Sequence, residues 1–113
     1  MVKKKVSNKA WVREHNSDHY VLAAKRDGFR SRASYKLIEL DDRFNFLSPG
    51  AKVLDLGSSP GGWSQVAISK ITNKGQLVAS DILPMESITD VNFIKGDFTD
   101  NDVMERIICA FYA

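Results

Sequence analysis

The stretch that decides the fold is "VLDLGSSPGGWSQVA", residues 53–67. An apolar run carrying one carboxylate, Asp55, leads into a loop with glycines at 57, 61 and 62, and Trp63 opens a helical pattern. A strand that turns through glycines into a helix is typical of the first ligand-binding loop of a doubly wound α/β sheet. Glycines such as Gly57 let the backbone approach a ligand closely, and the helix start offers N–H groups and a positive end. The stretch therefore predicts a site for a flat, polar ligand.

Strand and helix patterns alternate from this loop to the end of the chain. The predicted strands are 51–56, 76–81 and 91–97, and the predicted helices are 63–71 and 99–111. The last helix is expected to open with the capping residues Thr99 and Asp100 and to bury one face, made of Val103, Met104, Ile107, Ile108 and Phe111. Such alternation predicts parallel pairing with right-handed crossovers, hence an α/β, Rossmann-like fold.

Two helices are predicted before the first strand, as an N-terminal extension. The first covers residues 19–27, with Ser17 and Asp18 as caps and Gly28 as the terminator. The second runs from about Ser31, with its buried stripe at Ala33, Leu37, Leu40 and Phe44. Residues 1–10 are expected to be a basic flexible tail, and residues 11–113 the N-terminal half of a Rossmann-like domain.

The net charge of +2 is unevenly distributed. Residues 1–36 hold ten basic and three acidic side chains, a net charge of +7, whereas the rest holds six basic and eleven acidic. A basic front end predicts a polyanionic partner, although a run of lysines at 1–9 is also typical of a solvated tail. Arg30 and Arg32 flank a turn beside aromatic residues, and this favours RNA, because guanidinium groups bind phosphates and aromatic rings stack on unpaired bases.

Other classes are disfavoured by composition. The single cysteine, Cys109, excludes an internal disulfide framework and a cysteine-built metal site. No apolar run approaches the roughly 20 residues of a membrane span, and the lysine-rich start lacks the apolar segment of a signal peptide. We expect a cytoplasmic protein without a membrane or metal partner.

The loop itself separates two ligand classes. A dinucleotide loop reads G-x-G-x-x-G, but this one reads G-S-S-P-G-G, with Ser59 where the second glycine is needed, and a P-loop lysine is also missing. Asp55 at the strand end suits a cation and would repel a phosphate. S-adenosylmethionine, a cationic nucleoside, is therefore favoured over a nicotinamide dinucleotide.

Two further aspartates follow the second and third strands. Asp81 is placed to accept hydrogen bonds from two ribose hydroxyls, and Asp97 to accept one from an exocyclic amine. Trp63 is open to two interpretations, as a core aromatic or as a wall of the pocket.

The motifs "RSRASYKL", "DLGSSPGGWSQ", "DILPM" and "FIKGDF", in this order, resemble the FtsJ/RrmJ family of RNA ribose 2'-O-methyltransferases over about residues 11–105. The resemblance implies a sheet that binds S-adenosylmethionine and a substrate ribose, a uridine of large-subunit ribosomal RNA. It also implies that Gly61 and Trp63 contact the cofactor, Asp81 its ribose and Asp97 its adenine. Lys36 matches the first lysine of the family's Lys-Asp-Lys-Glu catalytic set. The cofactor residues expected from both lines of reasoning are Asp55, Gly57, Gly61, Trp63, Asp81 and Asp97.

Lys36 fits this role chemically, because an ammonium group can orient a ribose hydroxyl and stabilise developing negative charge on its oxygen. It is expected to leave its helix beside the buried stripe, within reach of the sheet edge.

The chain departs from the family in length, since members run to about twice its size and carry their other catalytic residues after the third strand's helix. We therefore expect a fold truncated after that helix, the first strand as a bare apolar edge, and catalysis reduced or lost. The alternative function is that of a non-catalytic RNA-binding fragment.

Overall fold

The computed structural model describes residues 18–112, so the predicted tail 1–10 and the predicted cap Ser17 lie outside the described residues. The elements follow in the order expected of alternating strands and helices after a helical extension. They are α2 (His19–Asp27), α3 (Ala33–Phe44), β1 (Lys52–Leu56), α4 (Gly62–Ile71), β2 (Gln76–Asp81), β3 (Val91–Lys95) and α5 (Asn101–Tyr112). The predicted α/β class is confirmed.

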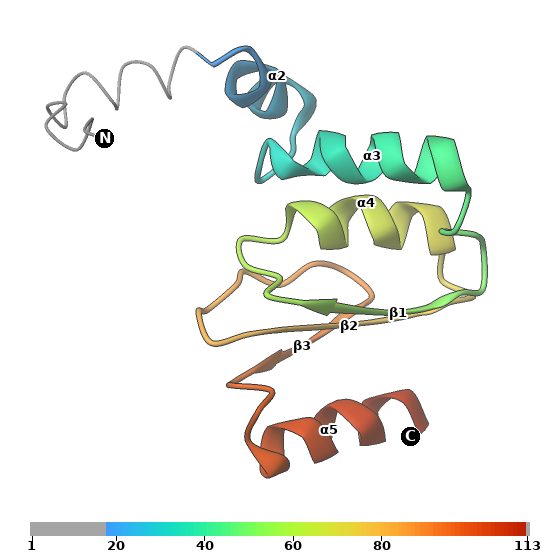
Figure 1. Ribbon diagram of the computed structural model, residues 1–113, viewed down its shortest axis with the longest axis vertical. Helices are drawn as coiled ribbons and strands as arrows, with labels where there is room; N and C mark the ends of the chain where they lie inside the picture. The colour runs from blue at the N-terminus through green and yellow to red at the C-terminus, as the bar shows by residue number, and fades with distance from the viewer. Residues whose placement is uncertain (1–17, 113) are drawn as a thin grey trace, which may run out of the picture.

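The three described strands form one parallel sheet in the order β1-β2-β3. Asp55 of β1 lies in register with Ala79 of β2, which in turn lies beside Phe93 of β3. Helices α3 and α4 lie on one side of the sheet and α5 on the other, as Figure 1 shows. The carboxyl ends of all three strands therefore meet at one edge, where the glycine loop begins.

Alternation along β2 divides the core between the two faces of the sheet. Leu77 and Ala79 pack with Leu37 of α3 and with the apolar side chains of α4, whereas Val78 packs with α5. The first cluster holds Leu37, Leu47, Val66, Ala67, Ile71, Leu77 and Ala79. The second holds Val78, Ile94, Val103 and Ile107.

The predicted limits of α2 are confirmed, and they come from its caps. Asp18 accepts hydrogen bonds from the backbone N–H of Tyr20 (2.7 Å) and Val21 (3.3 Å). Gly28 ends the helix in the left-handed region, with φ of 81°.

The predicted buried stripe of α3 is wrong at both ends. Ala33 is exposed and Phe44 is 65% exposed, while the buried side chains are Ser34, Leu37 and Asp41. Two of these buried residues, Ser34 and Asp41, are polar, and each makes hydrogen bonds outside the helix. Ser34 donates to the carbonyl of Gly62 at 2.9 Å, and Asp41 accepts from the N–H groups of 46 and 47. These hydrogen bonds, to α4 and to the loop after the helix, place Ser34 and Asp41 on the buried face of α3.

The end of the chain shows smaller differences. Strand β3 ends at Lys95, so Asp97 follows it by two residues, and α5 begins at Asn101. On α5, Ile107 is buried as predicted, but Ile108 is 49% exposed, because one step of about 100° carries it off the sheet-facing side. No helix within residues 18–112 is long and apolar enough to span a membrane.

Strand β1 is an edge of the sheet among the described residues, which confirms the predicted apolar edge. Leu54 is 40% exposed and Leu56 is 43% exposed. A cavity of about 330 Å³ runs along this edge between β1, α3 and α4, with Val53, Leu56 and Phe46 among its lining residues.

Candidate cofactor cleft

The glycine loop folds back onto the end of β2. The N–H groups of Gly57 and Ser58 both donate to the carbonyl of Ser80, at 2.8 and 3.1 Å. Gly57 has φ of 74° and Gly61 has φ of 118°, a region that side-chain-bearing residues rarely adopt. The loop is therefore a fixed turn whose shape depends on these glycines.

A cavity of about 310 Å³ lies beside this turn, at the end of β1. Three of the predicted cofactor residues, Asp55, Gly57 and Trp63, line it. The remaining lining residues come from the same loop and from the turn before α3: Ser31, Ala33, Leu56, Ser58, Ser59, Pro60 and Gly62.

A second cavity, of about 290 Å³, lies at the ends of β2 and β3. It is lined by Asp81 and Asp97, and Gly57 belongs to both cavities. The fold therefore brings the predicted residues together around two adjoining cavities: Asp55, Gly57, Trp63, Asp81 and Asp97.

Asp55 is a half-buried carboxylate on the α4 side of β1. Burial raises its pKa above the ordinary 3.8, and the charge of Asp81 raises it further, while a hydrogen bond from Ser64 acts in the opposite direction. The Ser64 hydroxyl donates to Oδ2 of Asp55 at 2.7 Å. A cation bound in the first cavity would favour the ionised form of this carboxylate.

Asp81 ties the end of β2 to both neighbouring loops. Its Oδ1 accepts from the N–H of Leu83 at 3.0 Å, and its Oδ2 accepts from the N–H of Ser59 at 2.8 Å. The hydrogen bond from the N–H of Leu83 is the main cause that lowers the pKa of Asp81 below 3.8. Hydrogen bonds from the backbone of Ser59 and Ile82 lower the pKa further. Each carboxylate oxygen can accept more than one hydrogen bond, so an ionised Asp81 retains acceptor capacity for hydroxyl groups.

Asp97 stands at the far end of the second cavity. Its Oδ1 accepts from the hydroxyl of Thr99 at 2.7 Å and from the N–H of Thr99 at 2.9 Å. These bonds lower the pKa of Asp97, the hydroxyl bond most, so this carboxylate is an ionised acceptor near neutral pH. Thr99 was predicted as a helix cap, but its hydroxyl and its N–H both donate to Asp97.

Trp63 lines the first cavity and also connects α4 to α3 by a hydrogen bond. Its ring lines the first cavity and is 39% exposed, and its indole N–H donates to the carbonyl of Ala33 at 2.7 Å. Gly61 is buried and lines neither cavity, since a Cβ there would meet Arg30 Nη1 and Ile88 Cδ1 at 3.1 Å each. Gly61 therefore contributes to the shape of the loop without lining either cavity.

Lys36 is exposed on α3, three residues beyond Ala33, and lines neither cavity. Residues three apart are neighbours on a helix surface, so Lys36 lies next to the rim that Ala33 forms. Its catalytic role stays a prediction. No cluster of three or more potential metal-ligating side chains occurs within residues 18–112.

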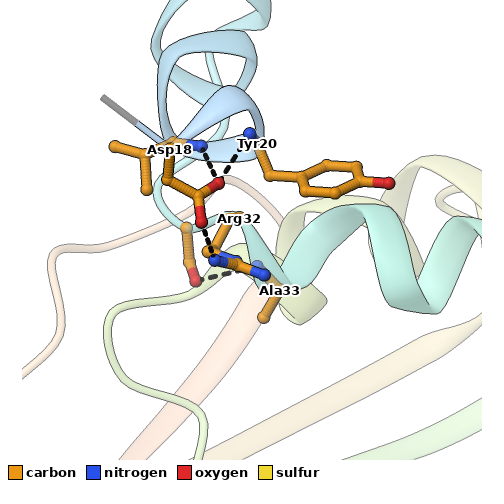
Figure 2. A network of polar contacts seen from close by, with 6 residues as sticks. Asp18, Tyr20, Arg32 and Ala33 are labelled. Atoms are coloured by element: carbon orange, nitrogen blue, oxygen red, sulfur yellow. Dashed lines mark hydrogen bonds and ion pairs between the residues drawn. The ribbon is translucent and has the colours of Figure 1, made fainter. Parts of the chain in front are cut away.

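The two arginines predicted to bind RNA are both engaged within the chain. Arg32 forms an ion pair with Asp18, as Figure 2 shows, and its guanidinium carbon lies 5.5 Å from the centroid of the Tyr20 ring. Arg30 donates to three backbone carbonyls, those of Pro60 (3.1 Å), Glu86 (2.7 Å) and Ser87 (3.0 Å). RNA binding by either side chain stays a prediction.

Two serines of the site were missed at the sequence level. The hydroxyls of Ser58 and Ser80 are buried and lack a hydrogen-bond partner among the described residues, and each residue lines one of the cavities. Buried polar atoms normally have partners, so these two hydroxyls are unsatisfied polar groups next to the cavities. Their positions next to Gly57 and Asp81 were the only signal in the sequence.

Comparisons with known proteins agree with this geometry. Residues 29–111 match the family described as FtsJ-like methyltransferase. A ribosomal RNA large subunit methyltransferase E from Psychrobacter cryohalolentis is 52% identical over 102 residues, which are 90% of this chain and 49% of that protein. Its counterpart from Pseudomonas aeruginosa is 54% identical over 108 residues, covering 96% and 52% of the two chains. This chain spans about half the length of these curated relatives.

A crystal structure of a ribosomal RNA methyltransferase from Plasmodium falciparum is also similar. It superposes with a TM-score of 0.58 at 38% identity, over 66% of this chain and 41% of that one.

Proposed function

Since this chain belongs to the FtsJ-like methyltransferase family, we propose that it is the S-adenosylmethionine-binding half of an RNA ribose 2'-O-methyltransferase that acts on large-subunit ribosomal RNA. The observation that carries the proposal is the pair of cavities that share Gly57, with carboxylates at both ends.

The residues present fit S-adenosylmethionine. Asp55 offers a negative charge to the cationic methionine portion, and the bare backbone at Gly57 leaves room for the ligand. Asp81 retains acceptor capacity for ribose hydroxyls, and Asp97 is an ionised acceptor for an amine. A nicotinamide dinucleotide fits less well, because its pyrophosphate would lie near the Asp55 carboxylate.

When bound, S-adenosylmethionine supplies an electrophilic methyl group for a ribose oxygen. The chain's own residues bind and orient: Trp63 closes one side of the first cavity and Asp81 fixes the two loops around it. Lys36, at the rim, orients the ribose hydroxyl and stabilises charge on its oxygen. The curated relatives are about twice as long as this chain, so we expect this chain alone to transfer methyl groups slowly or not at all.

The RNA is engaged by the basic surface before β1. Lys25 and Arg26 are the basic residues in the last turn of α2. The guanidinium group of Arg32 lies over the ring of Tyr20. A large-subunit ribosomal RNA, with uridine as the methylated nucleotide, remains the proposed substrate, and a cytoplasmic location remains the expectation. A chain that binds RNA without cofactor is the competing function.

Titration calorimetry tests the proposal. We expect heat on adding S-adenosylmethionine or its demethylated product to the chain, and a large loss of affinity in Asp81→Asn, which removes the ionised acceptor. NADH serves as the matched control ligand. Tighter binding of NADH than of S-adenosylmethionine would refute the proposal, and salt-dependent RNA binding without any cofactor binding would select the competing function.

A further inference from the structure

Arg30 lies across the join between the glycine loop and the loop from 82 to 90. Its Nη1 donates to the carbonyl of Pro60 in the first loop and to that of Glu86 in the second, and its Nη2 donates to the carbonyl of Ser87. Three carbonyls from two loops therefore converge on one guanidinium group.

The backbone of Arg30 is also fixed. Its N–H donates to Oε1 of Gln65 on α4 at 2.8 Å, and the Gln65 amide donates to the carbonyl of Gly28 at 3.2 Å. The stem of the side chain covers Gly61, where a Cβ would meet Arg30 Cδ at 3.2 Å. Arg30 is thus held at its base by α4 and holds two loops at its tip.

These loops adjoin the proposed cofactor-binding groups, because Gly57 lies in the first loop and Asp81 directly precedes the second. Ser59 connects them by donating its hydroxyl to the carbonyl of Pro84 at 2.8 Å and its N–H to Asp81. Among the described residues, Pro60 is joined to the segment around Glu86 by hydrogen bonds of Arg30 alone. The side chain of Ile88 adds an apolar contact beside Gly61. Loss of Arg30 would let the segment around Gly61 move relative to Asp81.

We propose that Arg30 is a positioning residue for the cofactor site, which sets the spacing of the two loops through its planar guanidinium group, and that it is not primarily a phosphate contact. A lysine cannot replace it, because an ammonium is a point charge without the fixed fork that spans separate carbonyls. A pure phosphate contact would tolerate lysine, since its charge is retained. The cofactor-affinity part of this inference rests on the proposed function.

The test compares Arg30→Lys and Arg30→Gln with the unsubstituted chain. Lys25→Gln is the matched control, because it removes one positive charge from the same hollow, which both residues line. Amide hydrogen exchange is measured for residues 57–62 and 82–90, together with affinity for S-adenosylmethionine and the salt dependence of RNA binding.

We expect both Arg30 variants to exchange faster in the two loops, with β3 and α5 unchanged, and to bind S-adenosylmethionine about tenfold more weakly or worse, as misplaced binding groups do. Lys25→Gln is expected to change neither the loop exchange nor the affinity for S-adenosylmethionine, and to weaken only RNA binding, because Lys25 belongs to the proposed RNA surface. Unchanged exchange and unchanged cofactor affinity in Arg30→Lys would overturn the inference. If the unsubstituted chain binds no S-adenosylmethionine, the proposed function fails, and the exchange data still decide whether Arg30 holds the loops. If Arg30→Gln fails to fold, Arg30→Lys and the exchange measurement carry the test.

Discussion

The indole N–H of Trp63 donates to the backbone carbonyl of Ala33 across 2.7 Å. This bond joins the first turn of α4 to the first turn of α3, the helix that carries Lys36. The hydroxyl of Ser34 adds a parallel link to the carbonyl of Gly62 at 2.9 Å. The cofactor loop and the helix with the predicted catalytic lysine are therefore held as one unit.

Replacing Trp63 by Phe tests the first of these links. The ring is largely retained but the donor is lost, so we expect the free energy of unfolding to fall by about 1 kcal/mol. Urea denaturation measures this change. An unchanged denaturation midpoint would mean that the indole bond does not contribute to stability.

Gly57→Ala is expected to impair cofactor binding much more than its effect on folding suggests. Gly57 has φ of 74°, and a Cβ there would meet no protein atom within 4 Å. Gly57 lines both cavities, so we expect the added methyl group to take up space that the cofactor needs. Gly50→Ala is the matched control, since Gly50 has φ of 91° and equally open surroundings but lines neither cavity. Both variants should lose about 1 kcal/mol of stability through backbone strain, and only Gly57→Ala should lose affinity in calorimetry. Equal affinities would show that the cofactor does not occupy this space.

The ionisation of Asp55 should make the free energy of unfolding depend on pH. Its folded-state pKa is raised above 3.8, so the folded chain retains this proton after the unfolded chain has lost it. The contribution of this residue to stability is therefore most favourable below pH 3.8 and is lost as pH rises to the folded-state pKa. Asp55→Asn removes the effect, so its stability relative to the unsubstituted chain should increase over that window. Denaturant titrations at a series of pH values, on both proteins, measure the difference; a constant difference would contradict the assigned shift.

Asp18→Asn should strengthen RNA binding by the basic surface. Asp18 pairs with Arg32 (Figure 2), so a phosphate has to compete with its carboxylate. Asparagine caps a helix about as well as aspartate, so α2 should persist. We expect severalfold tighter RNA binding, lost again on adding Arg32→Gln. RNA affinity measured at several salt concentrations provides the readout, and circular dichroism checks α2.

Self-association should depend on the exposed edge of β1. Leu56→Lys places a charge on that edge, and charged side chains oppose strand pairing between chains. Ile108→Lys is the matched control, because Ile108 is similarly exposed, at 49%, on α5. Sedimentation velocity should show less association for Leu56→Lys alone. If both variants behave alike, β1 is not the surface responsible.

Local signals in the sequence predicted most of the fold. Asp18 and Gly28 defined α2 because caps act within one turn, and the glycine loop located the crevice because its neighbours along the chain form it. The face of α3 was mispredicted because Ser34 and Asp41 are buried by hydrogen bonds to segments distant in the chain or beyond the helix end. Apolar periodicity carries no information about such bonds.

The site was predicted in the same uneven way. Parallel strands end at one edge of the sheet, so the sequence could predict that Asp55, Asp81 and Asp97 lie near one another, and they line adjoining cavities. Their contacts with a cofactor stay predictions. The contacts of Arg30 were not foreseeable, since its partners are backbone carbonyls as far as 57 residues away, and any residue type can supply a carbonyl. The same holds for the indole bond of Trp63.

The opposite placement of α4 and α5 has a consequence for chains that continue past this point. The path from β1 through α4 to β2 advances across the sheet in one direction, and α5 leaves β3 on the other face (Figure 1). Because crossovers between parallel strands are right-handed in about 98% of cases, a helix on that face reverses the direction of travel. In the longer relatives, the strand after the equivalent of α5 would then land outside β1. Growth of the sheet on that flank would turn β1 from an edge strand into an interior strand.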